Sequence, residues 1–146
     1  MKFPRNIPLY GDAKFRGACP KEDVEQVSFF NKIRREYPTS WGLIALHPRN
    51  EGLVYGGQFA NMIKRKAEGM TTGASDIVIP GQPSFVCEMK RLDHTKSAWQ
   101  DGQIAYLGAA QETGSFVCIA LGAKAAWVAF QDYLDMYHGS VERAIA

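Results

Sequence analysis

The chain has 146 residues, of which 46% are hydrophobic and 22% are charged, as is normal for one globular domain. The 17 lysines and arginines against 15 aspartates and glutamates give a net charge of +2, so bulk charge does not by itself indicate a polyanionic partner. The N-terminus has no continuous apolar segment and the three cysteines form no CxxC pair, so we expect a reduced, cytoplasmic protein without a signal peptide or membrane anchor.

The expected elements follow from apolar periodicity and from prolines and glycines that end each run. Residues 1–19 mix prolines, glycines and charges and are expected to form an irregular N-terminal arm, with 20–146 as a single domain. We expect helices over 20–38, over 58–69, within 95–114 and over 123–139, and strands over 41–48, 76–80, 84–90 and 115–121.

The order of these elements predicts an α/β fold with a mixed central β-sheet flanked by helices. Residues 76–80 and 84–90 are joined by a tight turn around Gly81 and Pro83, which predicts an antiparallel hairpin. The long helical connection from 84–90 to 115–121 is what a parallel crossover requires.

The first helix places two polar residues on its expected inner face. At about 100° per residue, Glu22 and Gln26 fall within the apolar arc, whereas Glu25 falls outside it. The arc is defined by Val24, Val27, Phe29, Phe30, Ile33 and Tyr37. Glu22 therefore either meets polar groups in the fold or simply complements the positive end of the helix dipole.

The hairpin carries charges that are costly on half-buried strands. Side chains alternate along a strand, so Glu88 and Lys90 share one face, and Asp76 on the neighbouring strand can lie about 5 Å from Glu88. Two carboxylates so close repel each other unless a cation lies between them. Mg²⁺ is commonly held by one or two carboxylates together with substrate phosphate, and a lysine beside them supplies a charge for a phosphate oxygen. This set favours metal-assisted phosphodiester hydrolysis.

Several motifs together resemble the VRR-NUC family of the PD-(D/E)xK nuclease superfamily, in particular its small stand-alone phage and prophage members. The hairpin reads ASD-(x11)-E-x-K, with Ser75 where the superfamily has proline. HPRNEG at 47–52 is similar to the family's IPNGG loop, with Arg49 before Asn50 and Glu51 in place of a glycine. KAEGMTTGASDIVI, VCEMK and GQIAYLGAAQETGSFVCIAL resemble further family segments, so the resemblance extends over roughly residues 20 to 135.

The resemblance implies a restriction-endonuclease-like core and assigns roles to the residues of the hairpin. Asp76, Glu88 and the backbone carbonyl of Met89 are expected to bind Mg²⁺ or Mn²⁺. Lys90 is expected to position the attacking water and to stabilise negative charge in the transition state. Gln103, on the following helix, is expected to orient Lys90 or the water.

Two positions of the expected site have alternative candidate residues. Glu22 is expected to complete the site directly or through a water, because Glu22 and Gln26 match the family's E-x-x-x-Q helix, but Glu25 remains a rival. The gap from the lysine to Gln103 is longer than the family suggests, so Gln100 remains a rival for Gln103.

The resemblance also implies partners and an activity. His47 and Asn50 in the matching loop, and the basic run Lys64, Arg65 and Lys66, are candidates for contacting DNA. We expect a homodimeric endonuclease that cuts branched DNA such as Holliday junctions, with no nucleotide cofactor and no membrane association. The alternative is a non-catalytic DNA-binding or phage accessory module that keeps the nuclease fold.

Overall fold

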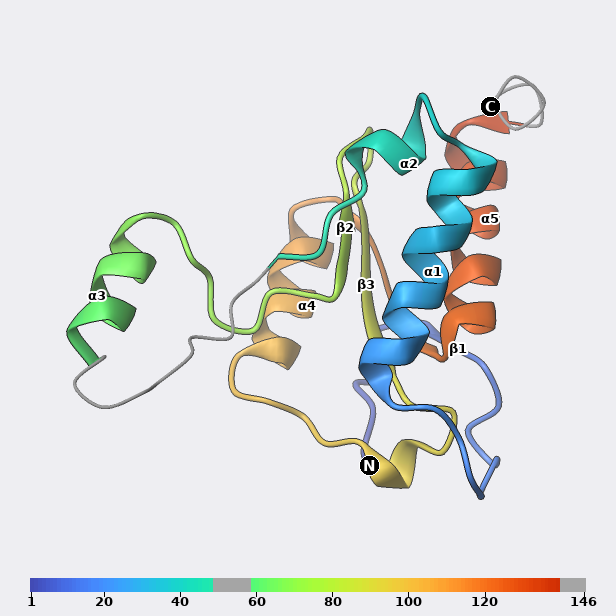
Figure 1. The fold of residues 1–146 in the computed structure, drawn as a ribbon, viewed down its shortest axis with the longest axis horizontal. Helices are drawn as coiled ribbons and strands as arrows, with labels where there is room; N and C mark the ends of the chain where they lie inside the picture. Colours follow the sequence, from blue (N-terminus) through green and yellow to red (C-terminus); the bar gives the residue numbers. More distant parts are fainter. Residues whose placement is uncertain (49–58, 140–146) are drawn as a thin grey trace.

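The structure is a computed structural model that describes residues 1–48 and 59–139, with the side chains of 59–61 excepted. A four-stranded sheet in the order β1-β4-β3-β2 forms the centre of the domain (Figure 1). The strands are β1 (Leu9–Tyr10), β2 (Ile77–Ile79), β3 (Phe85–Lys90) and β4 (Phe116–Leu121). β2 runs antiparallel to β3, whereas β3 and β1 both run parallel to β4. The predicted mixed sheet, hairpin and parallel crossover are confirmed.

Helices cover both faces of this sheet (Figure 1). They are α1 (Glu22–Glu36), α2 (Trp41–Ile44), α3 (Phe59–Ala67), the 3₁₀ turn η1 (His94–Lys96), α4 (Gln103–Glu112) and α5 (Ala123–Tyr137). α1 and α5 pack against each other and against one face, and α4 packs against the other. α3 projects away from the sheet (Figure 1). No helix in the described part of the chain is long and apolar enough to cross a membrane.

Alternation along β3 separates the two cores. Phe85, Cys87 and Met89 belong to the large cluster beneath α1 and α5, whereas Val86 belongs to the smaller cluster beneath α4. Glu88 and Lys90 share the face of Val86, as predicted, because side chains two residues apart point to the same side. Both charged groups are therefore directed toward the side of the sheet from which α4 approaches.

The expected strand over 41–48 is wrong. Residues Trp41–Ile44 form the short helix α2, and only Leu46 reaches the sheet, through a bridge to Val78. Gly42 explains the helix, because its backbone N–H donates to the Tyr37 carbonyl at 2.8 Å and an added Cβ would lie 2.5 Å from the Ile33 carbonyl oxygen. A short apolar run is consistent with either element, and this close packing on the end of α1 favours the helix.

Two further expectations need correction. The N-terminal arm is not wholly irregular, since Leu9 and Tyr10 pair with Ile119 and Ala120 as strand β1. The apolar arc expected on α1 is only partly buried. Phe29, Phe30, Ile33 and Tyr37 are buried, whereas Val24 and Val27 are 52% and 58% exposed.

Candidate active site

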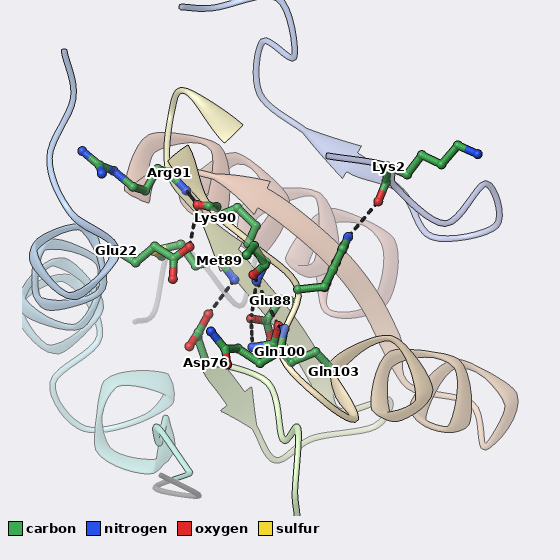
Figure 2. A network of polar contacts seen from close by, with 12 residues as sticks. Lys2, Glu22, Asp76, Glu88, Met89, Lys90, Arg91, Gln100 and Gln103 are labelled. Atoms are coloured by element: carbon green, nitrogen blue, oxygen red, sulfur yellow. Dashed lines mark hydrogen bonds and ion pairs between the residues drawn. The ribbon is translucent and has the colours of Figure 1, made fainter. Parts of the chain in front are cut away.

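Asp76 and Glu88 lie opposite each other at the open end of the hairpin. Ile77 pairs with Cys87, so the antiparallel register places Asp76, directly before β2, beside Glu88 on β3. Glu88 is only 1% exposed. An Asp76 carboxylate oxygen accepts a hydrogen bond from the Met89 backbone N–H at 2.8 Å (Figure 2). Because the N–H and C=O of a strand residue point to the same edge, the Met89 carbonyl is directed toward the side of Asp76.

This pair of acids is electrostatically unfavourable on its own. Burial, followed by repulsion from Asp76, raises the pKa of Glu88 to about 9, although Lys90 acts in the opposite direction. Burial also raises the pKa of Asp76, while the Met89 N–H partly offsets the increase. The Glu88 Oε2 atom is buried without a hydrogen-bond partner. The site therefore offers carboxylate oxygens, the ligands that a hard divalent cation takes, and the charge of such a cation would favour their ionised form.

The donor set for such a cation is small. Within residues 1–48 and 59–139, no three His, Cys, Asp or Glu side chains come together as a ready-made metal cluster. Asp76, Glu88 and the Met89 carbonyl are the groups that could hold the ion. One or two carboxylates suit Mg²⁺, which keeps several of its water ligands and takes further oxygens from substrate phosphate.

Lys90 is fixed within the fold although it carries a charge. It is 1% exposed, and its Nζ donates to the Ala98 carbonyl at 2.9 Å and to Gln103 Oε1 at 3.0 Å. The ammonium lies 4.6 Å from the centroid of the Trp99 ring. Its distance to Glu88 Oε1 is 3.5 Å, longer than either hydrogen bond to a neutral acceptor. Neutral oxygens and an aromatic face thus hold Lys90 more closely than the carboxylate does.

Gln103 joins the two charged groups of β3. Its Nε2 donates to Glu88 Oε1 at 3.0 Å, and its Oε1 accepts from both Lys90 Nζ and the Gln100 backbone N–H at 2.8 Å (Figure 2). Gln103, and not the alternative Gln100, therefore has its side chain next to Lys90. The Gln100 backbone N–H orients the Gln103 amide, and Gln100 also lines the cavity described below.

Gly73 brings α4 to the strands. It is buried with φ +79°, and an added Cβ would lie 2.2 Å from the carbonyl carbon of Gly102 and 2.5 Å from the Gln103 nitrogen. The segment before β2 thus packs directly on the first turn of α4, an approach that only glycine allows. This contact places Gln103, the first residue of α4, over Glu88.

The two acids of α1 have different surroundings. Glu22 Oε1 accepts a hydrogen bond from Ser97 Oγ at 2.6 Å, and Glu22 lines the same cavity as Asp76. Glu25 faces the other way, and its Oε2 accepts from the Ala123 backbone N–H at 2.5 Å, at the start of α5. Glu25 thus satisfies a free N–H group of that helix, whereas Glu22 is directed toward the site.

A cavity of about 510 Å³, here called the site cavity, opens over these groups. The residues that line it come from α1, the segment before β2 and the loop before α4. They are Glu22, Thr72, Gly73, Asp76, Trp99, Gln100, Asp101 and Gln103. Three separate parts of the chain therefore converge on one concave, polar site.

Comparisons with known proteins identify the fold. No family model matches the sequence, and no curated protein matches it either. Among solved structures, the chain is similar to a protein described as a VRR_NUC domain protein, with a TM-score of 0.61 and 18% sequence identity over 83% of this chain and 92% of the other. The chain has the VRR-NUC fold. The restriction-endonuclease-like architecture expected from the sequence is confirmed by this likeness.

Within the VRR-NUC fold, the residues proposed to contact DNA are dispersed. His47 donates through Nδ1 to the backbone carbonyl of Asp76 at 2.8 Å, since a carbonyl can only accept. Lys64, Arg65 and Lys66 lie on the projecting helix α3, where Lys64 pairs with Glu68 at 3.8 Å (Figure 1). Asn50 lies outside the described residues. The structure thus brings His47 to the site and leaves the basic run apart from the sheet, and their roles toward DNA stay predictions.

Sequence reasoning missed most of the loop from Ser97 to Gln100, which contacts several groups of the candidate site. Ser97 bonds Glu22, Ala98 bonds Lys90, and the Gln100 N–H bonds Gln103. Two of these contacts use backbone atoms, which no residue pattern reveals. Trp99 packs against the smaller core cluster, lines the cavity and covers Lys90.

Proposed function

We propose that this chain is a VRR-NUC family nuclease that hydrolyses phosphodiester bonds in DNA with Mg²⁺ or Mn²⁺. One observation carries the proposal: two opposed carboxylates, one with an unpartnered buried oxygen, lie beside a lysine that the fold holds in place. Burial and the neighbouring Asp76 raise the pKa of Glu88, so this acid pair does not serve to stabilise the fold. Groups with such shifted pKa values cluster at functional sites.

Different residues of the chain would bind the metal ion and stabilise the transition state. Asp76, Glu88 and the Met89 carbonyl would hold the ion, and Glu22, which lines the same cavity as Asp76, would contribute directly or through a water. When bound, the ion supplies Lewis-acid activation of water and neutralises charge on the phosphate. The Lys90 ammonium is already fixed by its two hydrogen bonds, so it can stabilise developing negative charge without reorganising.

Gln103 acts through other groups. By accepting from Lys90 and donating to Glu88, its amide fixes the separation of the two charged side chains. It also leaves Glu88 Oε2 without a hydrogen bond, so that oxygen remains available as a ligand. Gln103 is therefore a positioning residue, and Lys90 is the group that meets the phosphate.

The finer parts of the proposal are the DNA structure that is cut and the assembly. We propose a homodimer that prefers branched DNA such as a four-way junction, a preference that rests on the resemblance to stand-alone VRR-NUC proteins. A symmetric dimer would present two sites and make paired cuts. Sedimentation of the purified protein, alone and with a junction, tests the assembly.

The cleavage assay uses a labelled four-way junction, a flap and a linear duplex, each with Mg²⁺, Mn²⁺ or EDTA. We expect metal-dependent cutting that is lost in Asp76→Asn, Glu88→Gln and Lys90→Ala, while Glu36→Gln on the exposed side of α1 keeps it. Cutting that persists in EDTA or in the three site variants would contradict the mechanism. DNA binding without cutting by the intact protein would favour the non-catalytic binding module.

A further inference from the structure

A second cavity adjoins the site cavity. It has a volume of about 410 Å³ and is called here the flanking cavity. Glu22 and Gln100 line both cavities, so they form a shared wall. The flanking cavity is otherwise lined mainly by the segment that follows Lys90, including Arg91 and Lys96. The segment that follows Lys90 therefore lies beside the site cavity.

Two cations of the flanking cavity are anchored by neutral groups. Arg91 donates through Nε to the Pro20 carbonyl at 3.0 Å and through a terminal nitrogen to the Cys19 carbonyl at 2.6 Å. Lys96 Nζ donates to the Gly17 carbonyl at 2.9 Å. All three acceptors belong to residues 17–20, which lead into α1. The anchors fix both side chains without neutralising either charge.

No carboxylate in the described part of the chain forms an ion pair with Arg91 or Lys96. Glu22 is the carboxylate in the wall, and its Oε1 accepts from Ser97 Oγ at 2.6 Å. A guanidinium has five N–H donors and an ammonium has three, so each cation keeps donors after its carbonyl contacts are made. The flanking cavity therefore presents positive charge and N–H groups held in fixed positions.

This arrangement selects a particular ligand chemistry. Arg91 and Lys96 can donate but cannot accept, which excludes a cation and suits an anion with several oxygens. A guanidinium forms paired hydrogen bonds to phosphate, and prior anchoring reduces the rotamer entropy lost on binding. A backbone phosphate of DNA has this chemistry and is already present beside any phosphodiester in the site cavity.

We propose that Arg91 and Lys96 form a subsite for the DNA phosphate adjacent to the one that is cut. The inference rests on the proposed function, because it takes the site cavity as the place of the scissile phosphate. It differs from the expectation that Lys64, Arg65 and Lys66 supply the phosphate contacts. That run lies on the projecting helix α3 (Figure 1). The flanking cavity instead shares a wall with the site itself.

The first test measures DNA binding without cutting. A fluorescein-labelled junction is titrated in Ca²⁺ buffer with the wild type, with Arg91→Gln/Lys96→Gln, and with Lys32→Gln/Arg35→Gln as the charge-matched control on α1. We expect about tenfold weaker binding for the subsite variant at 50 mM salt, and a slope of log affinity against log salt that is smaller by about one. Arg91→Lys should recover part of the loss, because it keeps the charge but not the planar group.

The second test locates the phosphate. Single methylphosphonates, which remove the charge of one phosphate, are placed in turn along each strand of the junction. At the adjacent position the neutral linkage should weaken wild-type binding by about the same factor as the double substitution, and it should cause no further loss in Arg91→Gln/Lys96→Gln. Everywhere else the two losses should add.

The outcomes separate the subsite from the nuclease activity. If the subsite variant keeps wild-type affinity and salt slope, or if the losses add at every position, the subsite is refuted even when the wild type cuts DNA. If the wild type shows the expected binding pattern but never cuts, the proposed nuclease activity fails and the phosphate site stands. A melting temperature equal to that of the wild type excludes unfolding as the cause of weaker binding, and a clearly lower one would point to a structural role for the anchors.

Discussion

Glu88 should destabilise the metal-free protein, and Glu88→Gln should therefore stabilise it. The pKa of Glu88 rises from 4.5 to about 9 on folding, with burial as the largest cause. Because the pKa of Glu88 is higher in the folded state, its contribution to the free energy of unfolding is fully present below pH 4.5 and is lost as the pH rises toward 9. At pH 7.5 the three pH units above 4.5 correspond to a loss of about 4 kcal/mol in the free energy of unfolding.

Glutamine has nearly the shape of the protonated acid and cannot ionise in the unfolded chain. In EDTA, Glu88→Gln should therefore unfold with a higher free energy than the wild type by up to about 4 kcal/mol at pH 7.5. The difference should shrink to near zero at pH 4.5. Urea unfolding followed by circular dichroism at several pH values measures both, with Glu36→Gln as the exposed control on α1.

A competing interpretation predicts that Glu88→Gln lowers the stability. Lys90 lies 3.5 Å from Glu88 Oε1, and if that ion pair dominated, removing one partner would leave a buried charge and cost about 3–5 kcal/mol. We favour the raised pKa because Lys90 is held mainly by Ala98 and Gln103, and because Glu88 Oε2 has no partner. A less stable Glu88→Gln protein at pH 7.5 in EDTA would refute this reasoning. Mg²⁺ should stabilise the wild type increasingly as the pH rises and should have little effect on Glu88→Gln.

Three further predictions concern the hydrogen bonds and the close packing around the site. Gln103→Ala should lower kcat by about 10- to 100-fold with little change in KM, because Lys90 loses an acceptor; steady-state cleavage kinetics measure it, and equal loss through KM would contradict a positioning role. Glu25→Ala should lower stability by about 1 kcal/mol and keep cutting. Glu22→Ala should keep its stability and lose cutting, and thermal melts and cleavage assays on both variants test this. Gly73→Ala should destabilise the fold by more than about 1 kcal/mol, measured by urea unfolding, and wild-type stability would show that α4 can shift away from the β2 segment.

The parts of the site that could be predicted are those fixed by strand geometry. Asp76, Glu88 and Lys90 come from one hairpin, and a period of two with a short turn settles which side chains share a face. The prediction that these three gather needed no tertiary information. The α/β class followed similarly, because the helical connection between 84–90 and 115–121 has the length that a parallel crossover requires.

The parts that failed depend on contacts between distant segments. Residues 41–48 are apolar enough for a strand, but the packing of Gly42 on the end of α1 makes the first half helical, and the sequence holds no sign of that contact. Strand β1 in the N-terminal arm has two residues, too few for any periodicity. In both places tertiary packing decides between states that are nearly equal locally.

The loop from Ser97 to Gln100 shows why site residues of ordinary type escape a sequence analysis. Its work is done by one hydroxyl, two backbone groups and a tryptophan ring, none of which marks chemistry by itself. The Trp99 indole N–H donates to the Lys2 carbonyl at 2.7 Å, and Phe3 meets the Trp99 ring edge-on, with 6.4 Å between the ring centroids. The N-terminal arm therefore supports the ring that covers Lys90.

These contacts give the N-terminal arm a role in orienting residues around the site. An arm that only covered the sheet would need apolar contacts such as those of Ile7, which is 5% exposed. Residues 17–20 instead offer carbonyls to Arg91 and Lys96, and Lys2 offers one to Trp99. Because a carbonyl orients a cation without neutralising it, these contacts can fix Arg91 and Lys96 and leave their charge for the phosphate backbone. The precision of the site then depends on backbone atoms more than seventy residues away along the chain.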